Sequence, residues 1–148
     1  MLRAGRVAVI VVVVVLVGAF SGCGRKQASA GDFAGHWTSS QWGEHYFSVD
    51  GSTVKVIYPD RQGYIVGTVD GDTFTGWWTQ PPDRQPPTAG EVRFRLKWDA
   101  DKRIIDGSWR PGTTGEFSED WDLTRVDGTI PADVATQFSN ASLFVPHP

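Results

Sequence analysis

The only thiol in the chain, that of Cys23, follows directly behind an apolar run and two small residues. A disulfide needs a second cysteine and a structural zinc site usually needs several ligands, so Cys23 can form neither alone within one chain. Arg3 and Arg6 precede the apolar run 7–20, and this order of basic, apolar and small residues is the layout of a secretory signal. Fourteen helical residues span about 21 Å, less than the hydrocarbon core of about 30 Å, so we expect the segment to be removed.

The stretch Phe20-Ser21-Gly22-Cys23 resembles the lipobox of bacterial lipoproteins, with Phe20 at a position where leucine is more usual. The resemblance implies a diacylglycerol attached to Cys23 through a thioether, cleavage before Cys23, and acylation of the new amino terminus with a fatty acid such as palmitate. Acyl chains contribute about 0.8 kcal/mol per buried methylene, so together they anchor a protein stably. An ordinary cleaved signal peptide with an incidental cysteine is the alternative.

Other residue types that carry chemistry lack the spacing that chemistry needs. His36 and His45 lie near Glu44 and Asp50 but form no spaced metal-ligand motif. The chain has no nucleophile elbow and no glycine-rich phosphate loop that leads from a strand into a helix. An acidic group without the geometry of a calcium loop is formed by Glu116, Glu119, Asp120 and Asp122. We therefore predict no enzyme, no metal site and no cofactor.

Cleavage before Cys23 leaves 126 residues, which is enough for one domain. It removes two of the 14 basic residues and none of the 17 acidic ones, so the mature chain carries a net charge of −5. Nucleic-acid binding requires a basic surface, so we expect no nucleic-acid partner. The chain divides into a signal peptide (1–22), a lipidated cysteine with its tether (23–32), a β domain (33–126) and a tail with a short helix (127–148).

The β domain is predicted from short runs that alternate apolar and polar residues between turn-forming residues. In "EVRFRLKWD" four apolar side chains alternate with three basic ones, so one face belongs to the core and the other to solvent. Short connections such as "DGS" at 50–52 and "DGD" at 70–72 are typical of hairpins. The expected strands are 33–40, 43–49, 53–58, 63–69, 73–80, 90–98, 103–110 and 118–126. We predict an all-β fold, a single antiparallel up-and-down meander of about eight strands closed as a small barrel.

A motif of an apolar residue, a glycine and a tryptophan at alternate positions recurs within these strands. Its copies are Phe33-x-Gly35-x-Trp37, Phe74-x-Gly76-x-Trp78 and Ile105-x-Gly107-x-Trp109. The three positions of each copy share one face of a strand, so a bulky residue, a gap and an indole follow one another on the inner surface. Glycines inside strands mark bends or close approaches, which a small barrel needs.

The early Gly35-x-Trp37, the meander and the closing "WDLT" at 121–124 resemble the avidin and lipocalin class of calycin-like barrels, and also uncharacterised bacterial secreted domains. The resemblance covers roughly residues 33–126 and implies a barrel that holds a small apolar ligand in its mouth. Avidin's polar biotin contacts have no counterpart, so biotin is not expected. The expected barrel-closing positions are Gly35, Gly76, Gly107 and Trp121.

Two interpretations remain open for the tryptophans. In the first, four indoles line an apolar pocket with a few polar groups at its rim. In the second, the same indoles fill the barrel, and the facing glycines make room for them. The four candidates are Trp37, Trp78, Trp98 and Trp109. Trp42 and Trp77 fall on the opposite phase or in a turn, so we expect them to be exposed and available to a ligand or partner.

The segment 79–91 carries four prolines and interrupts the series of short turns. Proline fixes the backbone and removes a donor, so this connection is stiff and extended, and it serves either as a binding surface or as a neutral excursion.

We expect a membrane-anchored lipoprotein on the extracytoplasmic side of the cell envelope, in the outer membrane where a cell has two. Its domain is expected to be a noncatalytic binding module for a small apolar or lipid-like ligand; the alternative is a structural or protein-interaction domain with a filled core.

Overall fold

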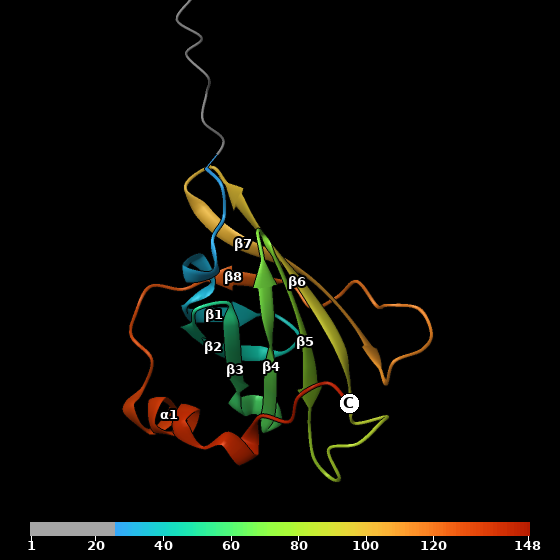
Figure 1. The fold of residues 1–148 in the computed structure, drawn as a ribbon. Helices are drawn as coiled ribbons and strands as arrows, with labels where there is room; N and C mark the ends of the chain where they lie inside the picture. Colours follow the sequence, from blue (N-terminus) through green and yellow to red (C-terminus); the bar gives the residue numbers. More distant parts are fainter. Residues whose placement is uncertain (1–25) are drawn as a thin grey trace, which may run out of the picture.

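The computed structural model describes residues 26–148, which form an eight-stranded antiparallel barrel (Figure 1). Each strand pairs with the next in sequence, and the first strand pairs with the last, which confirms the predicted closed meander. The strands are β1 (Gly35–Ser39), β2 (Gly43–Asp50), β3 (Thr53–Tyr58), β4 (Gly63–Asp70), β5 (Thr73–Thr79), β6 (Ala89–Asp99), β7 (Lys102–Pro111) and β8 (Leu123–Arg125). The signal segment and Cys23 lie outside the described residues.

The closing strand β8 is much shorter than the predicted strand 118–126. Its pairs with β1 join Trp37 to Arg125 and Thr38 to Thr124, and Thr124 also faces Ile104 of β7. Residues 112–122 leave the regular ladder after β7 and contact the strands again at isolated points, such as the bridge between Trp109 and Ser118. The seam of the barrel therefore rests on few backbone pairs.

Side chains reinforce this seam. The Arg125 guanidinium lies 5.7 Å from the Trp37 ring centroid and donates a hydrogen bond to the His36 carbonyl at 2.9 Å. Gly35, with φ +112°, makes room for it, because a Cβ at this position would lie 2.1 Å from the Arg125 Nη1 atom. A side chain at Gly35 would thus push against the strand that closes the barrel.

The interior is filled with rings. The largest fully buried side chains include Trp37, Trp121, Tyr58, Phe33, Phe47, Phe74 and Phe94. Phe33 belongs to a 3₁₀ helix, η1 (Ala30–Phe33), and not to the first strand as predicted. Its carbonyl accepts a hydrogen bond from Trp37 Nε1 at 2.8 Å, so this turn covers the end of the barrel where the tether enters. The core of the barrel is thus built mainly from closely packed rings.

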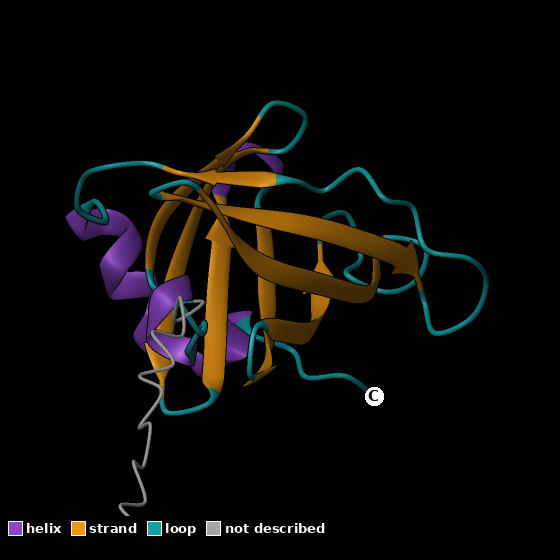
Figure 2. Cartoon of the chain, turned by 90° about the horizontal axis from the view of Figure 1, so that it is seen from above, coloured by secondary structure: helices purple, strands orange, loops and turns teal. Residues whose placement is uncertain are grey.

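Residues 127–148, here called the strap, run along the outside of the barrel (Figure 2). The strap contains α1 (Ala132–Ala135), η3 (Thr136–Ser139) and η4 (Ala141–Leu143). Val134 and Phe144 of the strap are buried in a second apolar cluster with Tyr46 and Ile57 on the outer faces of β2 and β3. No helix among residues 26–148 is long and apolar enough to cross a membrane.

Candidate functional site

Four tryptophans meet at the end of the barrel that carries the β1–β2 turn and the β7–β8 connection. Trp42 stacks on Trp121 with ring centroids 4.5 Å apart, and it meets the edge of Trp109 at 5.4 Å. Trp78 also meets Trp109, at 5.5 Å. These four residues, here called the tryptophan plug, pack against one another and do not surround a space.

Polar partners hold each indole of the plug in one orientation. Trp109 Nε1 donates to Asp120 Oδ1 at 2.7 Å, and Trp42 Nε1 donates to the Asp120 carbonyl at 3.1 Å. Trp78 Nε1 donates to the Arg110 carbonyl at 3.2 Å. Because every donor has an acceptor, the plug satisfies the usual condition for burying polar atoms.

The fourth indole, Trp121, donates to a buried histidine. Its Nε1 atom lies 2.9 Å from Nε2 of His45, and Nδ1 of His45 lies 2.9 Å from the Gly43 carbonyl. The Trp121 donor and the carbonyl acceptor fix His45 as the neutral tautomer with its proton on Nδ1. Burial lowers the pKa of His45 to about 4, so the ring is uncharged at neutral pH. Tyr58 stacks on His45 at 5.3 Å, and burial raises the pKa of its phenol.

The structure separates the four tryptophans that were candidates for a common pocket. Trp78 and Trp109 belong to the plug, and Trp37 is fully buried beside the closing strand. Trp98 lies at the other end of the barrel, opposite Arg103 and next to the β6–β7 turn. The four indoles therefore do not line one cavity.

The expected exposure of Trp42 and Trp77 is wrong. Trp42 is only 8% exposed because it lies on Trp121, and Trp77 is only 4% exposed because the strap covers it. His147 of the strap meets the Trp77 ring edge-on at 5.0 Å. Both covers come from segments distant in sequence, which strand periodicity does not reveal.

The glycines named as barrel-closing lie in different places. A Cβ at Gly107 would lie 1.9 Å from the carbonyl oxygen of Trp121, so Gly107 lets the chain before β8 approach β7. Gly76 faces Gly67 of β4, away from the seam, and a Cβ there would lie 2.5 Å from the Phe74 ring. Arg125 was not among the predicted site residues, and its only signal in the sequence is that it is the lone cation of the expected strand 118–126.

A hollow of about 490 Å³ lies on the outer wall of β4, β5 and β6, beside the end of the strap. Its lining includes Thr68, Thr75, Gly76 and Arg93. No residue of the tryptophan plug lines it.

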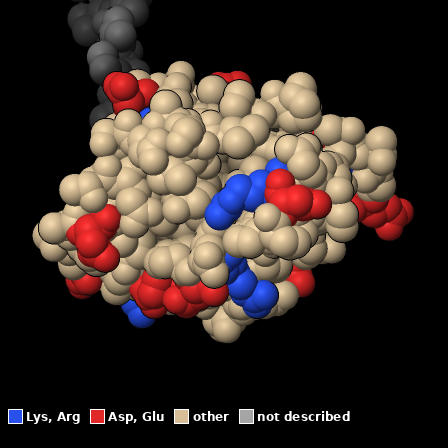
Figure 3. Space-filling view, turned by 90° about the horizontal axis from the view of Figure 1, so that it is seen from below, with Lys and Arg blue, Asp and Glu red and all other residues tan. Residues whose placement is uncertain are grey.

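Seen from the side of the proline-rich loop, acidic and basic side chains are scattered over the surface and form no single-sign patch (Figure 3).

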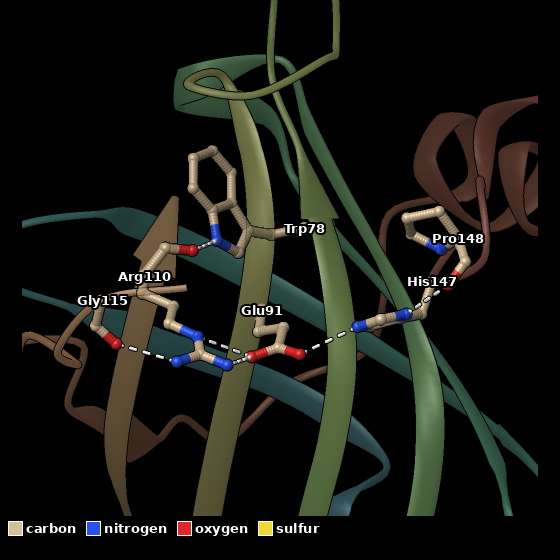
Figure 4. Close-up of polar contacts among 6 residues, drawn as sticks. All are labelled: Trp78, Glu91, Arg110, Gly115, His147 and Pro148. Atoms are coloured by element: carbon tan, nitrogen blue, oxygen red, sulfur yellow. Dashed lines mark hydrogen bonds and ion pairs between the residues drawn. The ribbon is translucent and has the colours of Figure 1, made fainter. Parts of the chain in front are cut away.

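Three ionisable side chains fasten the strap beside the hollow on the outer wall (Figure 4). Glu91 accepts from Arg110 Nε at 2.7 Å, and its other oxygen lies 2.8 Å from Nε2 of His147. Desolvation opposes ionisation of Glu91, yet the hydrogen bonds from His147 and Arg110 prevail and lower its pKa. The hydrogen bond to Glu91 raises the pKa of His147. Arg110 also donates to the Gly115 carbonyl at 2.8 Å, so the group ties the strap to two strands and a loop.

A second hollow, of about 760 Å³, lies where the tether meets β6, and we call it the tether hollow. Lys26 lines it, with its Nζ atom 4.2 Å from the centroid of the Trp98 ring. Asp72, Arg95 and Lys97 also contribute to its wall. Trp98 Nε1 is the one buried side-chain nitrogen or oxygen without a hydrogen-bond partner in residues 26–148.

Residues considered for metal binding have other partners. His36 pairs with Glu44 and stacks on Tyr46 at 4.7 Å, whereas His45 faces the interior. Asp122 accepts from the Gly107 amide at 3.1 Å. Within the described part of the chain, no three side chains of the metal-ligating types come together.

The chain matches no protein-family model, and searches of the curated proteins and of the solved structures find no match.

Proposed function

We propose that this chain is a lipid-anchored protein of the cell envelope whose barrel is a noncatalytic binding module with a filled interior. The observation that carries the proposal is the tryptophan plug, in which Trp42 and Trp121 stack at 4.5 Å where a barrel mouth would otherwise open. In this reading the module meets its partner, an envelope protein or a lipid, through its outer wall and its ends. We include in the proposal a kinship with the avidin and lipocalin class, supported by the eight-stranded meander that closes between β1 and β8.

A small apolar ligand inside the barrel is less well supported. Neither hollow is lined by a residue of the plug, and each indole of the plug has a hydrogen-bond acceptor. A ligand in the interior would have to displace rings that are already packed and hydrogen-bonded. The outside of the barrel offers space without that cost.

Native mass spectrometry of residues 24–148, produced without the anchor and without detergent, tests the filled interior. We expect the mass of the chain with no interior ligand. A reproducible extra mass of a few hundred daltons, lost in Trp78→Phe and retained in Trp98→Phe, would place a ligand in the plug end and contradict the proposal.

The anchor is tested separately in the full chain. Cys23→Ala removes the thiol that would receive the diacylglycerol, so the variant is expected to leave the detergent phase for the aqueous phase. Ser29→Ala, in the tether, is the matched control and should stay in the detergent phase. Equal partitioning of Cys23→Ala and the unchanged protein would exclude the anchor.

A further inference from the structure

The Trp98 side chain is half-buried, but its Nε1 atom is buried and has no acceptor among the described residues. Leaving a buried donor unpaired is unfavourable, and native proteins rarely do so without a reason. All four indoles of the plug, by contrast, have acceptors. The acceptor that Trp98 lacks is therefore a group to be identified.

Of the three cations that line the tether hollow, two form ion pairs with described residues and one does not. Arg95 pairs with Asp72 at 3.1 Å, and Lys97 pairs with Asp106. Lys26 makes no ion pair with any described residue, although its ammonium lies against the face of Trp98. An unpaired cation and an unpaired donor thus lie side by side.

We propose that the tether hollow binds an anionic oxygen group, a phosphate or a carboxylate. One oxygen of this group accepts the hydrogen bond from Trp98 Nε1, and the negative charge is balanced by Lys26. Asp72, in the same wall, is already neutralised by Arg95. The volume of about 760 Å³ accommodates a phosphate together with an attached group such as glycerol.

The tether is the movable wall of this site. No backbone hydrogen bond joins residues 26–28 to the barrel in the described chain. The first one in this region links Asp32 to Ser29 within the tether itself, at 3.0 Å. Admission of an oxygen to the buried Trp98 N–H requires a shift of the wall of the hollow, and Lys26 and Gln27 are wall residues that no backbone hydrogen bond of the described chain holds to the barrel.

The anion has two sources, a phospholipid headgroup or a free ion, and the first rests on the proposed anchor. Lys26 lies three residues after Cys23, so the two Cα atoms are within about 10 Å of each other. Lipid on Cys23 would hold the hollow at the level of the headgroups. The neighbouring turn carries Asp99 and Asp101, whose charges oppose attraction of the turn to an anionic surface.

The test uses residues 24–148, which contain every strand of the barrel including the two that close it. The probes are inorganic phosphate, phosphatidylcholine vesicles, and the same vesicles with phosphatidylglycerol. Binding is followed by the NMR signal of the Trp98 indole N–H and by co-sedimentation. We expect the Trp98 signal to move with phosphatidylglycerol and to remain in place with phosphatidylcholine alone.

Variants separate the site from general electrostatics. Lys26→Gln and Trp98→Phe should each weaken binding at least about tenfold, because each removes one partner of a charged hydrogen-bonded group. Lys102→Gln makes the same charge change in the adjacent hairpin without lining the hollow, and it should bind like the unchanged chain. Melting temperatures identify any variant that fails to fold.

Binding of phosphatidylglycerol without phosphate would identify a headgroup site, and binding of both would identify a site for free anions as well. The inference would be overturned by a Trp98 signal that moves with neither inorganic phosphate nor phosphatidylglycerol. Equal losses of binding in Lys26→Gln and Lys102→Gln would overturn it as well. Partitioning of Cys23→Ala reports on the anchor alone. Failure of the anchor and failure of the anion site are thus distinguishable.

Discussion

His45 is a titratable residue buried among aromatic rings and hydrogen-bonded to Trp121 of the tryptophan plug. The pH dependence of stability therefore tests whether the plug is packed as described. Burial lowers the pKa of His45 from 6.5 to about 4, so between these values the unfolded chain binds a proton that the folded chain does not. The contribution of His45 to the free energy of unfolding is therefore complete above pH 6.5 and declines as the pH falls towards 4. The expected decline in the free energy of unfolding from this one group is about 3 kcal/mol.

His45→Gln should remove this decline, because an amide can accept from Trp121 and donate to the Gly43 carbonyl without titrating. Urea unfolding at several pH values measures the effect. His36→Gln leaves the buried ring untouched and should keep the decline. Parallel pH profiles for the unchanged chain and His45→Gln would show that the ring is not buried as described.

His147 shifts in the opposite direction and fastens the end of the strap. Its hydrogen bond to Glu91 raises its pKa, so the contact is complete below the ordinary value of 6.5 and is lost as the pH rises through the raised pKa. We expect the NMR signal of the Trp77 indole to follow this titration, because His147 lies on that ring. The signal should be independent of pH in His147→Ala. A His147 midpoint at or below 6.5 would contradict the contact with Glu91.

At the scale of one residue, sequence predicted which side chains are large and apolar but not what covers them. Trp77 has the outward phase of its strand, and only the strap, some seventy residues later, removes it from solvent. His45 has the phase of a core position, which periodicity does indicate. Its link to Trp121 joins positions 76 apart in sequence, and no local pattern encodes such a pair.

Among the elements, the hairpins follow from local sequence, because alternation and turn residues set both the register and the bounds of β2 to β7. The predicted strand 63–69, for example, is β4, Gly63–Asp70. Strand β8 differs because its length depends on where residues 112–122 leave β7. The side chains of Asp120 and Asp122 decide this by bonding to Trp109 and to the Gly107 amide.

Gly107→Ala tests this close approach. The added methyl would lie 1.9 Å from a backbone oxygen, that of Trp121, which cannot rotate away as a side chain does. We expect a loss of about 1 to 3 kcal/mol in the free energy of unfolding, the usual range for overpacking. Gly31→Ala is the control, because its methyl would lie 4.0 Å from the nearest atom, Ser29 Oγ. Equal stability of the two variants would mean that the β7–β8 approach is looser than described.

For the molecule as a whole, two separate apolar clusters stabilise the fold. The interior cluster lies within the barrel. The barrel itself closes without the strap, because β1 pairs directly with β8. The outer cluster exists only where the strap covers β2 and β3. The sequence indicated the first through alternating strands, but it did not indicate the second, because Tyr46 and Ile57 lie on the face that alternation assigns to solvent.

Removal of residues 127–148 should therefore leave a closed barrel with an uncovered apolar wall. Burying one such side chain contributes about 1.5 to 3 kcal/mol, so loss of Val134 and Phe144 lowers the melting temperature without unpairing β1 and β8. Uncovered rings favour self-association, which light scattering after size exclusion detects as a mass that rises with concentration. The matched control, Val145→Ala, changes a strap residue that is 40% exposed and should stay monodisperse. A truncated chain that loses its β-sheet circular dichroism would instead mean that the strap is needed to close the barrel.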